Sequence, residues 1–205
     1  MNNLYAFGCS NTYGVALSDC WDTNLKKYNN PSNLAWPKLL ASKLGLNCIN
    51  LSVPGASNKE IAKTIIDNLF EFKKDDVIIV LWSYLSRWCI LKDDGVENLS
   101  YWKNSENSNF WVKNLYHQKD REFDNKIVIE YIYFLLKEKE LNFYFLTSDK
   151  ESFDSINFSK ASFLNVSFSN LKSSFPTALD NKHVGEEGHR FFADEIYNEI
   201  KKDNL

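Results

Sequence analysis

Short apolar runs alternate with amphipathic stretches along the 205-residue chain. Apolar runs typical of buried strands cover 4–8, 47–51, 77–82, 141–146 and, as a final edge strand, 163–168. Apolar residues at helical spacing predict helices over 34–44, 57–72, 124–139 and 186–202. Two caps support these bounds, because Gly45 fits the end of a helix and Ser57 with Glu60 forms a capping box. Strands that alternate with helices predict an α/β fold, with a mostly parallel sheet covered on both faces.

Two stretches interrupt the alternation. Residues 8–33 are rich in Ser, Asn, Asp and Tyr and predict a long loop with at most a helical turn. Residues 84–121 are polar yet rich in aromatic rings. A long connection of this kind is usually functional or disordered, and the rings argue against disorder. We therefore expect a single domain over 1–205, with an aromatic-rich insertion at 84–121 beside the functional site.

Charge and composition exclude several classes of function. The formal net charge is −3 and no long basic run exists, which argues against a nucleic-acid partner. No apolar stretch is long enough to span a membrane, and the N-terminus lacks the features of a signal peptide, so we expect a cytoplasmic protein. The four cysteines match no zinc or redox spacing. We therefore expect no metal and no cofactor.

Residues that directly follow strands deserve inspection, because ligands of parallel sheets bind at the carboxyl ends of the strands. Ser10 follows the first predicted strand, and Gly8 allows the backbone to turn sharply before it. Gly55 follows the second strand, at a point where its N–H group is well placed to donate to an oxyanion. Taken singly, each feature is more typical of an ordinary turn with a capping serine.

An acid and a histidine lie three residues apart just before the last predicted helix. The Asp180 carboxylate can hold Nδ1–H of His183 and leave Nε2 free to accept the proton of a serine. In isolation, an Asp and a His at this spacing are as typical of a solvated loop as of a catalytic pair. The other histidines are weaker candidates for a base, since His189 falls inside a predicted helix and His117 lies in the insertion.

Taken together, Gly-x-Ser at 8–10, Gly55 and Asp-x-x-His at 180–183 resemble the motifs of the SGNH (GDSL-type) hydrolases, over most of the chain. The resemblance implies a three-layer α/β/α sandwich with about five parallel strands. It also implies a serine esterase or O-deacetylase that cleaves acyl esters, often on sugars or lipids. Carried over to this sequence, it makes Ser10 the nucleophile, His183 the base, Asp180 its partner and the Gly55 N–H an oxyanion donor.

The sequence departs from the family pattern in two places. Cys9 stands where the family has the Asp of Gly-Asp-Ser. The third block, usually Gly-x-Asn-Asp, is replaced by Leu-Trp-Ser-Tyr at 81–84, so the Asn whose side chain completes the oxyanion hole is absent. Loss of one such donor typically costs about 10²–10³ in turnover. The candidates for a replacement donor are Ser83, Asn11, Asn58 and Arg87.

Two other interpretations stay open. The missing Asn also fits a catalytically degenerate module that binds a glycan on aromatic rings, although core packing explains those rings equally well. The rings in question are Trp82, Trp88, Trp102 and Trp111. A flavodoxin-like nucleotide binder shares only the sheet architecture, and the first loop lacks the glycine spacing of a phosphate cradle.

Overall fold

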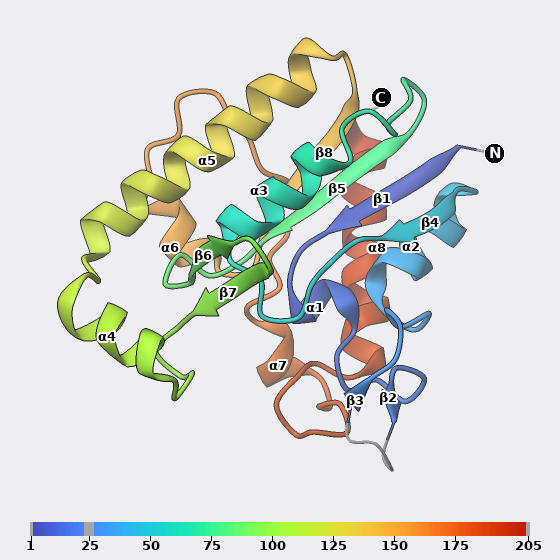
Figure 1. Ribbon diagram of the computed structural model, residues 1–205. Coiled ribbons are helices and arrows are strands. Elements are labelled where there is room, and N and C mark those ends of the chain that lie inside the picture. Colours follow the sequence, from blue (N-terminus) through green and yellow to red (C-terminus); the bar gives the residue numbers. More distant parts are fainter. Residues whose placement is uncertain (1, 23–26, 204–205) are drawn as a thin grey trace.

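The computed structural model describes residues 2–22 and 27–203 of the chain. Its centre is a parallel sheet with the strand order β4-β1-β5-β8 (Figure 1). The strands are β1 (Asn3–Phe7), β4 (Asn47–Asn50), β5 (Val77–Trp82) and β8 (Asn142–Thr147). All three strand pairs run parallel, so the four carboxyl ends lie at one edge of the sheet. The predicted α/β class is confirmed.

Helices cover both faces of this sheet and complete three α/β/α layers (Figure 1). One face carries α2 (Trp36–Leu44) and α8 (Glu186–Asp203), and the other carries α3 (Asn58–Asp67) and α5 (Gln118–Glu138). Successive residues of each strand point to opposite faces, so both faces need apolar side chains. This is why the strands are continuous apolar runs in the sequence.

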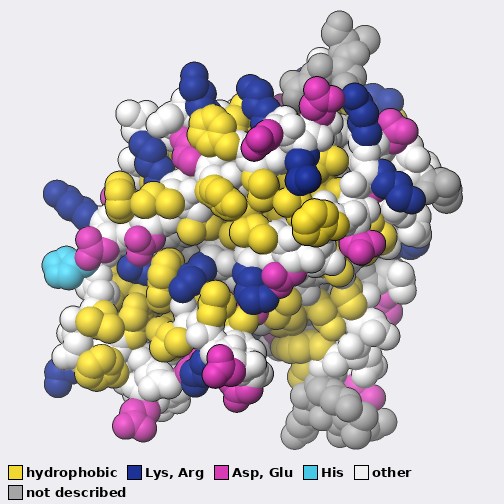
Figure 2. All heavy atoms as spheres, turned by 45° about the horizontal axis from the view of Figure 1, so that its top comes forward, with side chains coloured by type: hydrophobic (Ala, Val, Ile, Leu, Met, Phe, Trp, Pro, Cys, Tyr) yellow, Lys and Arg dark blue, Asp and Glu magenta, His cyan; other side chains and the backbone are white. Residues whose placement is uncertain are grey.

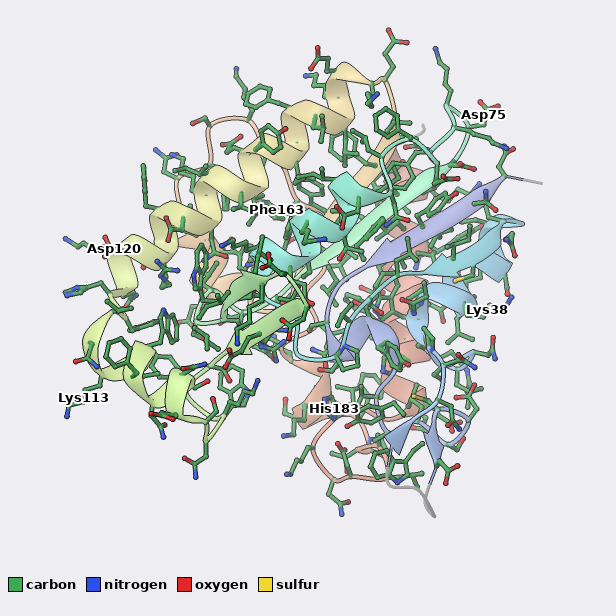
Figure 3. All side chains as sticks on the ribbon, viewed as in Figure 1. Lys38, Asp75, Lys113, Asp120, Phe163 and His183 are labelled. Carbon is green, nitrogen blue, oxygen red and sulfur yellow. The ribbon has the colours of Figure 1, made fainter. Side chains whose placement is uncertain are left out.

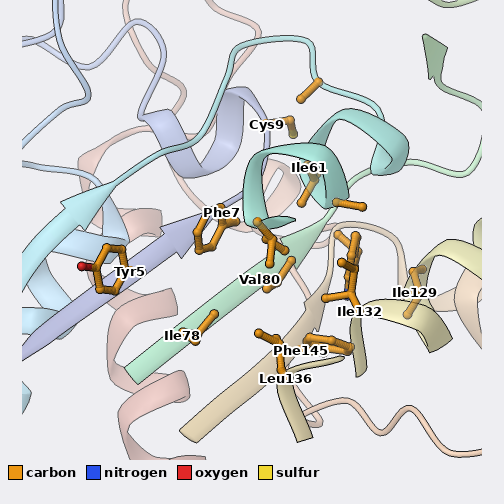
Figure 4. Packing of buried hydrophobic residues seen from close by; sticks show 14 of the residues in the cluster. Tyr5, Phe7, Cys9, Ile61, Ile78, Val80, Ile129, Ile132, Leu136 and Phe145 are labelled. Atoms are coloured by element: carbon orange, nitrogen blue, oxygen red, sulfur yellow. The ribbon is translucent and has the colours of Figure 1, made fainter. Parts of the chain in front are cut away.

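The core on the α3 and α5 side is built from large side chains of three strands (Figure 4). Phe7, Val80 and Phe145 project from the sheet and pack with Ile61 of α3 and Ile132 of α5, all nearly inaccessible to water. Burial of one such side chain contributes about 1.5–3 kcal/mol to folding. This packing fixes the strand ends, and hence the loops that follow them.

Both predicted caps are confirmed in position, but the capping box of Ser57 and Glu60 is only half formed. Gly45 ends α2 with a φ of 69°, in the left-handed region that glycine adopts without strain. The Ser57 hydroxyl accepts the N–H of Glu60 at 3.3 Å and so begins α3. The Glu60 carboxylate does not complete the reciprocal capping box, because it instead accepts a hydrogen bond from the Asn98 side chain at 2.6 Å.

Shorter elements occupy the two stretches that interrupted the alternation. The predicted loop at 8–33 contains α1 (Ser10–Tyr13) and an antiparallel pair of two-residue strands, β2 (Trp21–Asp22) and β3 (Lys27–Tyr28). The predicted insertion contains a hairpin, β6 (Trp88–Lys92) with β7 (Gly95–Leu99), followed by α4 (Glu106–Asn114). The short helices α6 (Lys150–Asp154) and α7 (Leu171–Ser174) lie between β8 and α8.

Three predicted elements are wrong in extent. The edge strand over 163–168 is reduced to one bridge between Thr147 and Ser167, so the sheet has four strands in the described part of the chain, rather than about five. The helix expected at 124–139 already begins at Gln118, because its first turns carry polar residues that the apolar period does not detect. Helix α3 ends at Asp67, and hydrogen-bonded turns replace the predicted last turn.

The outer surface of α5 remains apolar over several turns. Side chains that are half to two-thirds exposed there are Phe123, Ile127, Tyr131 and Phe134. Figure 2 shows hydrophobic side chains gathered in a band on the face that includes this helix. No helix within 2–22 and 27–203 has both the length and the apolar character needed to cross a membrane.

Candidate active site

Loops that follow three neighbouring strands bring the predicted site residues to the carboxyl edge of the sheet. Gly55 follows β4, Ser10 follows β1 and Ser83 follows β5, and these strands are adjacent in the order β4-β1-β5. Ser10 is the first residue of α1. A side chain at Gly8 would collide with the Thr12 hydroxyl, so glycine is what lets the chain fold back onto the strand end at this point.

Two backbone N–H groups beside Ser10 are unused. Within the described residues, no acceptor takes the N–H of Ser10 or that of Gly55. Gly55 has a φ of 85°, a left-handed conformation that only glycine adopts freely, and a Cβ there would meet no atom within 4 Å. The turn therefore exposes backbone donors next to a hydroxyl group, which is an arrangement suited to holding an oxyanion.

Asp180 holds the His183 ring. Its Oδ2 lies 2.6 Å from Nδ1 of His183, while Oδ1 accepts the N–H groups of Lys182 and His183 at 2.9 and 3.0 Å. Burial opposes ionisation of this carboxyl, but the hydrogen bonds from the His183 backbone and ring and from Lys182 prevail and lower the pKa of Asp180. The ionised carboxylate favours the tautomer with the proton on Nδ1, which leaves Nε2 to act as an acceptor.

The loop that carries this pair is fixed to the segment that follows α1. The N–H of Leu179 donates to the carbonyl of Ala16 at 3.1 Å, and Ala178 packs in one buried cluster with Val15 and Leu17. Figure 3 marks His183 on this side of the molecule. In the described structure no hydrogen bond joins the His183 ring to the Ser10 hydroxyl. The two ends of the chain thus meet in one region, without a hydrogen bond between the Ser10 hydroxyl and the His183 ring.

The Asn58 side chain forms its hydrogen bonds with other groups inside the protein. Its Oδ1 accepts the N–H of Ser83 at 2.6 Å, and its Nδ2 donates to the Ser83 carbonyl at 3.1 Å and to Asn125 Oδ1 at 2.7 Å. The residue is 1% exposed. This amide therefore fixes the backbone after β5 to the start of α3, and it has no free donor for a ligand.

Arg87 joins three loops. Its Nη1 donates to the Ser83 hydroxyl at 2.9 Å and to the carbonyl of Ala56, next to Gly55, at 3.3 Å. The guanidinium also lies 5.1 Å from the Tyr84 ring centroid and 5.2 Å from that of Trp102. Both Ser83 and Arg87 are buried. Their printed hydrogen bonds join the loops on either side of Ser10.

Cys9, the residue in place of the family Asp, is completely buried beside this cation. Burial opposes ionisation of the thiol, but the Arg87 charge and hydrogen bonds from the Asn11 N–H, Ser83 and Arg87 prevail and lower the pKa of Cys9. The thiol thus lies where the Arg87 charge acts on it directly.

Tyr84 is a site residue that the sequence analysis missed. Burial raises the pKa of its hydroxyl, the nearby Cys9 raises it further, and the hydrogen-bonding influence of the Asn11 side chain lowers it, so Tyr84 lies near both neighbours of Ser10. Its other side lines a cavity of about 230 Å³, together with Tyr116, Gln118, Arg121 and Asp149. Its position in the sequence could have indicated it, because Tyr84 comes two residues after the end of β5, where ligands of parallel sheets bind.

The tryptophans proposed as a glycan platform have different environments. Trp82 and Trp111 are buried and belong to the core, whereas Trp102 is 60% exposed and contacts Tyr84 edge-on with ring centroids 6.4 Å apart. Trp88 lies under the guanidinium of Arg121, at 4.1 Å. Only Trp102 of the four is largely accessible to a ligand.

His189 is structural, as expected. Its Nδ1 accepts the N–H of Trp36 at 3.2 Å, and burial lowers the pKa of the ring to about 3, so it is neutral. His117 is an exposed residue at the start of α5. Within 2–22 and 27–203, no three His, Cys, Asp or Glu side chains are grouped so that they could hold a metal ion.

Comparison with known proteins identifies the fold. No protein-family model matches the sequence, and no curated protein matches it significantly. Among solved structures, the chain is similar to the acetyl xylan esterase Est2A of Butyrivibrio proteoclasticus, with a TM-score of 0.58, 12% identity and 98% of this chain covered. It is also similar to the lipase Lip_vut3 from a goat rumen metagenome, with a TM-score of 0.58, 11% identity and 97% of each chain covered.

A third similar structure, from Desulfitobacterium hafniense DCB-2, is placed in the G-D-S-L family of lipolytic proteins, with a TM-score of 0.56, 10% identity, and coverage of 97% of this chain and 99% of that one. The chain spans 64% of the length of Est2A and 65% of another carbohydrate esterase that it matches. At these identities the similarity concerns the fold. The chain therefore has the three-layer SGNH hydrolase-like fold that its motifs predicted.

Proposed function

We propose that the protein is a serine esterase in which Ser10 is the nucleophile, His183 the general base and Asp180 its orienting partner. The observation that carries the proposal is the attachment of the Asp180–His183 pair to the segment directly after α1, which begins at Ser10. The N–H groups of Ser10 and Gly55 are the backbone oxyanion donors. Similar folds in esterases and a lipase support hydrolysis of an ester.

The reaction proceeds in two acyl-transfer steps. His183 Nε2 takes the proton of the Ser10 hydroxyl while Oγ attacks the ester carbonyl, and the same proton then passes to the departing alcohol. Water next attacks the acyl-serine, with His183 again as base, and releases the acid. Because Nε2 and Oγ share no hydrogen bond in the free protein, they must approach each other when substrate binds, as catalytic contacts in unliganded enzymes often do.

The cavity beside Tyr84 supports an alcohol portion with several hydroxyl groups. Its walls combine the Gln118 amide, the Asp149 carboxylate, serine hydroxyls and the Tyr84 and Tyr116 rings. Such convergent polar groups fix the orientation of a ligand that can both donate and accept hydrogen bonds. With about 230 Å³ available, the cavity fits one sugar-sized ring rather than a long acyl chain.

A fluorophosphonate probe and p-nitrophenyl acetate test the assignment. We expect the wild type to be labelled and to hydrolyse the ester, and Ser10→Ala to lose both properties. The matched control is Ser18→Ala, which removes a nearby exposed hydroxyl that bonds Glu186 at 2.6 Å. This control should keep full activity. Absence of labelling of the folded wild type, under conditions that label a known serine esterase, contradicts the proposal.

A second candidate function is a non-catalytic module that binds a glycan. The exposed Trp102 ring beside the cavity favours it. Under this alternative, Ser10→Ala leaves glycan affinity unchanged and Trp102→Ala abolishes it, while the wild type hydrolyses no ester. Titration calorimetry with a panel of oligosaccharides, alongside the esterase assay, separates the two functions.

A further inference from the structure

The Asn that supplies a side-chain donor in SGNH hydrolases has no counterpart at 81–84, so an ester hydrolysed at Ser10 needs another such donor. We propose that the Tyr84 hydroxyl is this donor and that the Asn11 side chain holds it in place. The inference rests on the proposed esterase function, and it names a residue that the sequence motifs do not indicate.

The buried polar groups near the site are already committed. The Asn58 amide is saturated by Ser83 and Asn125, with contacts of 2.6, 2.7 and 3.1 Å. Ser83 is 0% exposed and accepts from Arg87 at 2.9 Å. Arg87 Nη1 is bonded to Ser83 and Ala56, and its Nε is sealed from solvent without a partner. The donors of Asn58 and the Nη1 group of Arg87 are thus used within the protein.

Tyr84 is in the right place. It follows β5, whereas Gly55 follows β4, so the two flank Ser10, which follows the central strand β1. The Tyr84 ring packs on Arg87, whose Nη1 donates to the Ala56 carbonyl beside Gly55. The Asn11 side chain, next to the nucleophile in sequence, lowers the pKa of Tyr84 as a hydrogen-bond donor to the phenol oxygen does. Because an amide N–H donates to the phenol oxygen in that contact, the phenol O–H remains available for a substrate oxygen.

The Tyr84 ring is fixed independently of its hydroxyl. One contact is with the Arg87 guanidinium at 5.1 Å and another is with Trp102 at 6.4 Å. A donor held in this way needs no reorganisation when charge develops on the carbonyl oxygen, which is what makes oxyanion donors effective. Burial also keeps the phenol protonated, since it raises the pKa of Tyr84 above its usual value.

The test is Tyr84→Phe, which deletes the hydroxyl and keeps both ring contacts. We expect kcat for p-nitrophenyl acetate to fall by about 10²–10³, with KM changed less than about threefold. The matched control Tyr131→Phe removes an exposed tyrosine hydroxyl from the outer surface of α5, outside the cavity, and should leave kcat within about twofold. Thermal melting of each variant shows that the fold is intact.

A second variant tests the role of Asn11. Asn11→Asp keeps the shape of the side chain but turns the donor into an acceptor, which would draw the Tyr84 O–H away from the substrate and lower kcat to the level of Tyr84→Phe. If wild type is active and Tyr84→Phe keeps its kcat, the inference is overturned while the esterase assignment stands. A loss confined to Asn11→Ala, with Tyr84→Phe active, would instead make the Asn11 amide the donor. If the wild type itself neither hydrolyses esters nor labels, both proposals fall together.

Discussion

Replacement of Arg87 by Met should separate activity from stability. The change keeps a long apolar stem but deletes the cation that bonds the Ser83 hydroxyl and the Ala56 carbonyl at 2.9 and 3.3 Å. It also removes the contacts with the rings of Tyr84 and Trp102. These contacts tie the Gly55 turn to the loop after β5, so both sides of the candidate oxyanion hole lose a shared support.

Two opposing effects set the expected change in the free energy of unfolding. Two hydrogen bonds from a charged donor contribute about 1.5–3 kcal/mol each, or about 3–6 kcal/mol together. Against this, Arg87 forms no salt bridge with a carboxylate in the described chain, and relief from burying its charge returns several kcal/mol. The net destabilisation should be about 1–3 kcal/mol, which lowers Tm by roughly 3–10 °C for a chain of this size.

Activity should fall much further, because one displaced oxyanion donor alone costs about 10²–10³. The assay measures kcat/KM for p-nitrophenyl acetate at 25 °C, where the variant remains folded, and Tm by circular dichroism. Arg87→Lys is the companion variant, because it keeps the positive charge but loses the planar guanidinium group. Its kcat/KM and its Tm should lie between those of the wild type and of Arg87→Met. If kcat/KM drops less than about fivefold in the folded Met variant, Arg87 does not position the site.

Three further predictions follow from the structure. Asp180→Asn should lower kcat by about 10³–10⁴ without unfolding the protein. The amide oxygen would keep the N–H groups of Lys182 and His183, so the amide NH₂ would face Nδ1 and favour the His183 tautomer whose Nε2 carries the proton. Steady-state kinetics checks this, and an unchanged kcat contradicts the dyad. Between pH 7 and 5 the wild type should lose about 2 kcal/mol of its unfolding free energy through His189, because the folded ring with its pKa of about 3 stays neutral while the unfolded ring binds a proton below its ordinary pKa of 6.5. Urea titrations at both pH values should show that this part of the loss disappears in His189→Asn. Cys9→Asp should fold and gain thermal stability, since it places a carboxylate against Arg87, and a lower Tm in differential scanning calorimetry would contradict this pairing.

The sequence predicted the strands and the caps because each depends on local pattern. Val77–Trp82 is a continuous apolar run and its bounds were predicted correctly, as the burial of a central strand on both faces requires. The segment around Ser167 looked like a strand for the same reason. Its backbone forms a bridge to Thr147 and one hydrogen bond from the Leu164 N–H to the Phe145 carbonyl. No local pattern distinguishes a strand from an extended segment with so few sheet partners.

The residues of the candidate site also fall into those that local sequence indicates and those that depend on distant contacts. Ser10, Gly55, Asp180 and His183 lie in short motifs, so spacing alone identified them as candidates. The Asn58 amide was predicted as a donor, but its partner Asn125 is 67 residues away, and sequence gives no sign that the two side chains meet. Tyr84 was missed for the converse reason, since its importance depends on Asn11 and Arg87, which only the packed loops bring to it.

The exchange of Asp for Cys at position 9 and the loss of the family Asn are linked through Arg87. A carboxylate at position 9 would neutralise this cation fully and could draw it away from Ser83 and Ala56. The small buried thiol, whose pKa is lowered mainly by the Arg87 charge, competes less strongly for the guanidinium than a carboxylate would. The guanidinium therefore bridges both loops and holds the Tyr84 ring. Arg87 then does through Tyr84 what the missing Asn does directly. This account requires Cys9→Asp to raise stability and lower kcat at once, and a variant with raised stability and unchanged kcat would break the link.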